Sequence, residues 1–304
     1  MSPSLAFLAC VEAGRLESQA LLLCRSIRRF GGRYAGAAVH TFQPRRGPAL
    51  AAGTLAGLRD LGAVHHQEIL NEELARCGPA NKVFACAWAE ERLAEEVLVF
   101  LDSDTVLTGE PAELDLPPGI AAAARPAESS ALNSAGPGDP RDAYWRDLYA
   151  FLDLGAEPYV ETELGNRVRA FFSAGLVAAR REEGLFGRWR ETLLRLVRAG
   201  RVHPEGGLDR MDEVALAATL VPVFDRLRGL DPRYNYLIYR RARLAGAWPR
   251  ARLEDLVHLH YRSCFHHPGY LGGVEPPLDL EGEVGRWLAP HLPLEPRLAG
   301  RLPV

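Results

Sequence analysis

Hydrophobic and polar positions in the first third of the chain follow two alternating patterns. Three apolar runs have the length and composition of buried strands, residues 4–11, 36–42 and 97–101, and residues 63–69 predict a further strand. The segments between them space their apolar residues as one face of a helix does: residues 16–30, 49–61 and 80–94. Strands that alternate with helices predict an α/β fold, in which a mostly parallel, Rossmann-like sheet is flanked by helices.

The remaining two thirds of the chain are less regular. Apolar runs predict two further strands, and helical spacing predicts three further helices: residues 119–126 and 171–181, then 141–153, 182–199 and 211–220. Serine, glycine and proline predict a loop over residues 127–140. We expect one large domain over residues 1–274, and a proline-containing C-terminal tail, residues 275–304, packed on it as an appendage.

The strand at 97–101 ends in two aspartates, Asp102 and Asp104. Two carboxylates one residue apart would repel each other in a buried place, whereas a divalent cation would hold both. In parallel sheets, ligands bind beyond the carboxyl ends of the strands, which is where these aspartates are expected. The alternative is an acidic turn, since turns accept aspartate readily.

Composition excludes several classes of protein. The 304 residues are 47% hydrophobic, enough for a sizeable core, and carry a formal net charge of -3. Without a basic block, nucleic acid is not an expected partner, and no apolar run is long enough to span a membrane. The N-terminus lacks a basic n-region, and the five cysteines form no CxxC pair. These features predict a cytoplasmic protein with reduced cysteines.

One cation differs from all the others. Lysine and arginine together number 36, and Lys82 is the only lysine among them. A compact ammonium on a flexible stem differs in kind from a planar guanidinium. The exception predicts a site that needs an ammonium.

Five segments, in order, resemble the nucleotide-sugar glycosyltransferases of the GT-A fold. They are "NKVFACAW" with "VFLDSDTVL", then "FFSAGLVAARR", "DRMDEVAL", "DPRYNYL" and "VHLHY". The pattern is most similar to glycosyltransferase family eight, the glycogenin and lipopolysaccharide galactosyltransferase group, and to related bacterial proteins. The resemblance implies a hexosyltransferase that moves a sugar from a UDP- or GDP-sugar to an acceptor, with retention. It also implies a Mn²⁺ or Mg²⁺ cofactor.

The resemblance assigns roles to individual residues. Asp102, Asp104 and His260 are the expected metal ligands, with His258 as an alternative to His260. Lys82 and Arg262 are expected to offset charge on the diphosphate. Asp212 is expected to bind sugar hydroxyls. Further donor or acceptor contacts are expected at Val11, Glu12, Asn81, Ser103, Ser173 and Asn235.

The chain departs from the family pattern at three places. Ser173 stands where asparagine is common, and Glu213 stands where glutamine is common. His260 is followed by "YRSCFHHPGY" and not by the expected Lys-Pro-Trp. A carboxylate at 213 has two interpretations: it acts in catalysis beneath the anomeric carbon, or it is an acid at a helix N-terminus.

Other functions stay open at this point. A haloacid-dehalogenase-like phosphatase shares the D-x-D strand, but needs a downstream lysine, and none follows Lys82. A sugar-phosphate nucleotidyltransferase needs a glycine-rich turn near residue 12, where "VEAGRLE" has one glycine. A nucleotide-sugar-binding protein with a decayed site is the non-enzymatic alternative, favoured by the missing Lys-Pro-Trp.

Overall fold

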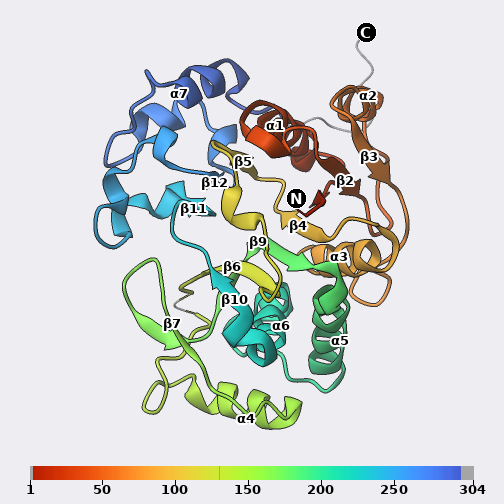
Figure 1. Ribbon diagram of the computed structural model, residues 1–304, viewed down its shortest axis with the longest axis vertical. Helices are drawn as coiled ribbons and strands as arrows, with labels where there is room; N and C mark the ends of the chain where they lie inside the picture. Colours follow the sequence, from red (N-terminus) through yellow and green to blue (C-terminus); the bar gives the residue numbers. More distant parts are fainter. Residues whose placement is uncertain (1–2, 130, 296–304) are drawn as a thin grey trace.

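The computed structural model describes residues 3–129 and 131–295 and has a mixed α/β architecture (Figure 1). Within those residues, seven strands form the central sheet in the order β10-β6-β9-β4-β1-β2-β3. Their bounds are β1 Leu5–Cys10, β2 Ala38–Phe42, β3 Ala63–His66, β4 Val97–Leu101, β6 Ala122–Pro126, β9 Phe172–Arg180 and β10 Leu227–Gly229. The helices are α1 Arg15–Phe30, α2 Ala52–Asp60, α3 Ala80–Arg92, α4 Asp142–Leu152, α5 Leu185–Arg198, α6 Met211–Leu220 and α7 Glu283–Leu288.

Strand β4 is buried on both faces, which is why its sequence is continuously apolar. Leu98 and Phe100 belong to the core cluster that includes α3, α5 and α6. Val97, Val99 and Leu101 belong to the cluster that includes α1. Successive side chains of a strand point to opposite faces, so a strand between two helical layers needs apolar residues at every position. The predicted fold class is confirmed.

The sheet differs from a purely parallel one at a single strand. Strand β1 pairs in parallel with β2 and β4, but β9 runs antiparallel to both β4 and β6. The beginning of β9 therefore lies beside the carboxyl end of β4, with Leu176 opposite Leu101. This direction brings the segment Ser173–Gly175 to the edge of the sheet where Asp102 follows β4.

Two smaller sheets complete the described part of the chain: β11-β12-β5 and β7-β8. Their strands are β5 Thr105–Leu107, β7 Tyr159–Glu161, β8 Arg167–Arg169, β11 Tyr236–Leu237 and β12 His258–His260. Strand β12 is antiparallel to β5, and the register sets His260 opposite Thr105. This pairing brings a segment near residue 260 next to the aspartates.

The C-terminal segment packs against the rest of the chain as far as it is described. Val284 and Leu288 of α7 belong to a core cluster with Leu259 of β12, and Trp287 packs edge-on against Phe30 of α1. Residues 296–304 of the predicted tail lie outside the described residues. Among the described helices, none combines the length and apolar character needed to cross a membrane.

Candidate active site

Asp102, Asp104 and His260 lie together at the carboxyl end of β4. One potential ligand atom from each lies within 4.8 Å of the other two. Backbone hydrogen bonds hold the segment, from Asp102 N to Gly175 O at 2.9 Å and from Tyr261 N to Asp104 O at 3.1 Å. The ligand set therefore depends on two strand pairings, β4 with β9 and β5 with β12.

The ring of His260 has a defined orientation. Asn235 donates from Nδ2 to Ser173 Oγ at 2.6 Å, so its Oδ1, 2.8 Å from His260 Nδ1, accepts a hydrogen bond from the ring. Nε2 then faces the Asp104 carboxylate at 3.3 Å. With Nδ1 donating to Asn235, the Nε2 lone pair and the Asp104 carboxylate face each other, an arrangement that suits a shared cation. Two carboxylates and one imidazole suit a divalent cation, so the residues present fit a metal site.

Gly175 leaves the space for this arrangement. A Cβ atom at this position would lie 3.0 Å from both Asn235 Oδ1 and His260 Nδ1. Asn235 itself has a positive φ of 51°, a conformation that asparagine tolerates better than most residues. His258, the alternative ligand, is fully buried, and its Nδ1 accepts a hydrogen bond from Asn235 N at 3.2 Å. The structure thus places His260, and not His258, beside the aspartates.

Lys82 connects the aspartates with α6. Its Nζ lies 2.8 Å from Asp102 Oδ1 and 3.4 Å from Asp212 Oδ2, and its side chain is 12% exposed. Burial disfavours the ammonium, but Asp102 and Asp212 outweigh it and raise the pKa of Lys82 above its ordinary value. Burial raises the pKa of Asp212 to about 6, although Lys82 acts in the opposite direction. The single lysine is therefore a buried counter-charge for two carboxylates.

Glu213 is paired differently. It lies in the first turn of α6, and Arg210 Nε donates to its Oε2 at 3.0 Å. Asp212 and Glu213 are both in this first turn, where a negative charge suits the positive end of the helix dipole. Arg210 pairs with one of the two carboxylate oxygens of Glu213.

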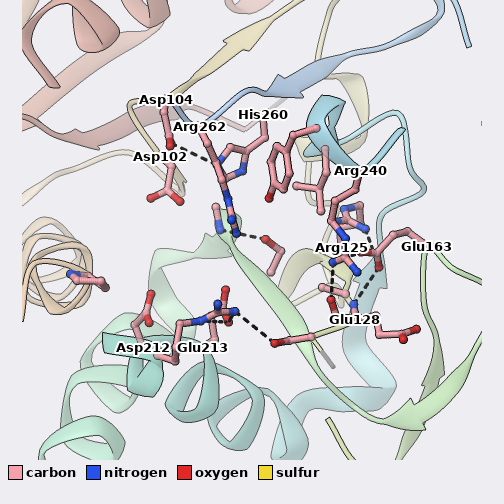
Figure 2. A pocket seen from close by; sticks show the side chains of 18 of the residues that line it. Asp102, Asp104, Arg125, Glu128, Glu163, Asp212, Glu213, Arg240, His260 and Arg262 are labelled. Atoms are coloured by element: carbon pink, nitrogen blue, oxygen red, sulfur yellow. Dashed lines mark hydrogen bonds and ion pairs between the residues drawn. The ribbon is translucent and has the colours of Figure 1, made fainter. Parts of the chain in front are cut away.

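These groups line one cavity of about 740 Å³. Lys82, Asp102, Asp104, Asp212, Glu213, His260, Arg262 and Ser173 all contribute to its wall. In Figure 2, Asp102, Asp104 and His260 lie on one side of the cavity, with Asp212 and Glu213 below them. Arg262 is exposed, and its guanidinium lies 4.4 Å from the ring centroid of Tyr239.

Five predicted contact residues do not line this cavity: Val11, Glu12, Asn81, Ser103 and Asn235. The side chain of Val11 is fully buried. Both carboxylate oxygens of Glu12 bind Arg45, at 2.5 and 2.7 Å, and Asn81 Nδ2 donates to Glu12 at 3.0 Å. Asn235 was expected to contact a substrate directly. In the described structure the residue is buried and contacts His260 and Ser173, so a direct substrate contact stays a prediction.

Sequence patterns did not reveal the far end of the cavity. Arg125 of β6 and Glu163 form a buried ion pair at 3.1 Å, and Arg240 Nη1 lies 3.6 Å from the same carboxylate. An arginine inside the alanine-rich run "AAAARP" was the available signal, because a buried guanidinium needs a partner. The partner itself could not be identified from spacing.

The fold of the chain is similar to that of several solved glycosyltransferases. The WbbM bifunctional glycosyltransferase is 13% identical, with a TM-score of 0.51 over 86% of this chain and 46% of that chain. The glycosyltransferase GlyE of Streptococcus pneumoniae TIGR4 is 16% identical, with a TM-score of 0.50 over 87% of this chain and 55% of that one. The galactosyltransferase LgtC, in complex with donor and acceptor sugar analogues, is 12% identical, with a TM-score of 0.50 over 86% and 90%.

The chain spans about half the length of the WbbM and GlyE chains and most of the LgtC chain. No curated protein sequence matches it.

The fold is that of a GT-A-like glycosyltransferase. Residues 7–220 match the Rhodobacterales glycosyltransferase domain, and the chain belongs to that family. These residues form a glycosyltransferase domain. Membership of family eight stays a prediction.

Proposed function

We propose that this glycosyltransferase is metal-dependent and transfers a hexose from a nucleoside diphosphate sugar, UDP- or GDP-linked, to a hydroxyl of an acceptor. The observation that carries the proposal is the convergence of Asp102, Asp104 and His260 at the wall of the 740 Å³ cavity. A bound Mn²⁺ or Mg²⁺ would offset charge on the departing diphosphate. Neither a phosphatase nor a nucleotidyltransferase is needed to explain the two aspartates.

Two cationic side chains that line the cavity, Lys82 and Arg262, would offset the charge of the diphosphate. Lys82 holds Asp102 in place. Arg262 is exposed at the cavity wall, two residues after His260. Arg262 would supply the charge that the missing Lys-Pro-Trp segment supplies in related enzymes. This role argues against a decayed, purely binding site.

The sugar would lie between the aspartates and the start of α6. Asp212 and Glu213 face the cavity there, and Ser173 lies on the adjacent wall. In the transfer, the bond from the anomeric carbon to the phosphate oxygen breaks, and a bond from that carbon to the acceptor oxygen forms. The acceptor proton leaves with the nucleoside diphosphate or to solvent. Retention of configuration is proposed from the motif resemblance.

The base and ribose would lie beside the end of β1. Ser103 and the backbone after Val11 are proposed contacts, while Glu12 and Asn81 would support that region through Arg45. We also propose residues 1–274 as the transferase domain and 275–304 as its appendage. A cytoplasmic location stays a prediction from the cysteine pattern.

Calorimetric titration with UDP, GDP, ADP and TDP tests the proposal, each with Mn²⁺ and with EDTA. One of these nucleotides should bind at least about tenfold more tightly with the metal, a difference of roughly 1.4 kcal/mol. Asp104→Asn should remove that gain, whereas Asp60→Asn, an exposed change at the end of α2, should preserve it. Equal affinity with and without EDTA would exclude metal dependence, and no binding by any nucleotide would exclude the donor class.

A further inference from the structure

The cavity has a second charged end, formed by Arg125, Arg240, Arg243, Glu163 and Glu128. Figure 2 shows Arg125, Arg240 and Glu163 across the cavity from Asp102 and Asp212. Because the donor is proposed to occupy the aspartate side, this end faces the space left for the acceptor.

This end carries more positive than negative charge. The side chains of Arg125 and Glu163 are 2% and 1% exposed, and the same carboxylate also faces Arg240. Glu128, the other acid, accepts hydrogen bonds from Thr162 Oγ1 at 2.9 Å and Asn166 Nδ2 at 2.7 Å. Arginine does not lose its proton in proteins, so three guanidiniums oppose two carboxylates.

Arg240 presents an unused edge of its guanidinium. Its described contacts involve Nη1 alone, with Glu128 O at 2.8 Å and Glu163 Oε1 at 3.6 Å. Within residues 3–129 and 131–295, its Nε and Nη2 make no hydrogen bond. Elsewhere in this chain such an edge binds a carboxylate, as Arg45 does with Glu12. Paired N–H donors of this kind suit a carboxylate or a phosphate.

Arg243 lies on the same face as Arg240. Both belong to the 3-10 helix Ile238–Arg243, in which residues three apart are nearly eclipsed. Arg243 is exposed at the cavity wall and pairs with no carboxylate of the described chain. Two like charges so placed repel each other unless an anion lies between them. Tyr239 of the same turn also lines the cavity, its ring 6.3 Å from that of His260.

We propose that the acceptor is an anionic glycan, whose carboxylate or phosphate group binds Arg240 and Arg243 while its reacting hydroxyl points toward the donor. This inference rests on the proposed function, because it assigns the donor to the aspartate side. Arg125 contributes positive charge from the buried wall, and Glu163 holds both Arg125 and Arg240 in place.

Three probes that differ only at one substituent test the proposal: methyl glucoside, methyl glucuronide and methyl glucoside 6-phosphate. Their affinities would be measured by NMR titration of the full chain with Mn²⁺ and the nucleotide that binds best. At least one anionic glycoside should bind about tenfold more tightly than the neutral one. A stronger carboxylate indicates a uronic acid acceptor, and a stronger phosphate indicates a phosphorylated one.

Arg243→Gln should abolish the preference for the anionic probe and leave nucleotide affinity unchanged. Arg250→Gln is the matched control, because Arg250 is exposed nearby but does not line the cavity. Equal binding of all three probes, or no binding of the anionic ones, would overturn the inference. Nucleotide binding by the same sample would still support the proposed function. Weaker nucleotide binding in Arg243→Gln would overturn it by placing Arg243 on the donor. If the unaltered chain binds none of the four nucleotides, the proposed function itself is rejected.

Discussion

Asn235 Oδ1 accepts a hydrogen bond from His260 Nδ1 at 2.8 Å, and this contact determines which ring nitrogen faces Asp104. The contact is buried and supported by Ser173. Groups that orient a metal-binding histidine typically change metal affinity about 10–100-fold when they are removed. Asn235 is therefore a positioning residue for the candidate metal site.

Asn235→Gly should weaken Mn²⁺ binding about 10–100-fold without direct loss of a ligand. Glycine keeps the positive φ of 51°, so the backbone stays unstrained. Asn235→Asp keeps an acceptor for the ring proton and should preserve most of the affinity. Mn²⁺ titration by electron paramagnetic resonance measures both variants. Equal Mn²⁺ affinity of the glycine variant and the unaltered chain would show that Asn235 does not position His260.

Lys82→Met should lower the free energy of unfolding by about 3 kcal/mol, since it leaves the buried Asp212 and the partly buried Asp102 without their cation. Arg92→Met, on the same helix but 53% exposed, should cost less than about 1 kcal/mol. Urea unfolding compares the two variants.

Lys82→Arg keeps the charge and should still lower turnover or weaken nucleotide binding. The ammonium lies between Asp102, Asp212 and the carbonyl of Ala174, at 2.8, 3.4 and 3.4 Å, where a guanidinium is larger and planar. Steady-state kinetics and nucleotide titration measure the effect. Unchanged values for both would mean that the chain's only lysine has no special role.

Glu213→Gln should leave kcat within about twofold of the value for the unaltered chain, because we expect a carboxylate paired with Arg210 not to act as the nucleophile. It should cost about 0.3–1 kcal/mol of stability through the helix dipole. A fall in kcat with unchanged donor affinity would instead assign the carboxylate a part in the transition state. A rise in KM alone would indicate binding of a sugar hydroxyl.

His258 should make the protein acid-sensitive. Burial, together with His260, lowers the pKa of His258 to about 3. The unfolded chain takes up this proton near pH 6.5, so between these values the unfolded state binds more protons. The contribution of the neutral His258 side chain to the free energy of unfolding is complete above about pH 6.5. It is lost as pH falls toward 3, on the order of 5 kcal/mol in all.

Urea unfolding over this pH range, with EDTA present, measures that slope. His258→Gln should flatten it, whereas His267→Gln, an exposed change, should leave it as it is. An equally steep slope in His258→Gln would assign the acid sensitivity to other groups.

The sequence predicted the elements of the first third well, because a strand between two helical layers leaves a local apolar pattern, as at Val97–Leu101. Asp102 and Asp104 were detectable for the same reason, since polar residues stand out at the end of such a strand. The antiparallel direction of β9 left no local pattern, because direction depends on a partner far along the chain.

The supporting residues were the hardest to predict. Asn235 was recognised as notable, but its burial and its contact with His260 could not be predicted, since burial of a single amide changes no periodicity. The Arg125–Glu163 ion pair joins two segments far apart in the sequence, and their spacing along the chain does not predict the contact. Such contacts follow from the tertiary arrangement and become visible only with it.

The pairing of β5 with β12 would make binding of the proposed cation a check on correct folding. His260 lies beside Asp104 only while it is opposite Thr105, and a shift of the pairing by one residue would turn its ring to the other face of the small sheet. A molecule with a misaligned C-terminal segment would keep both aspartates but lose the imidazole. Retention of Mn²⁺ would therefore separate natively folded molecules from misassembled ones in a preparation, even before any donor or acceptor is known.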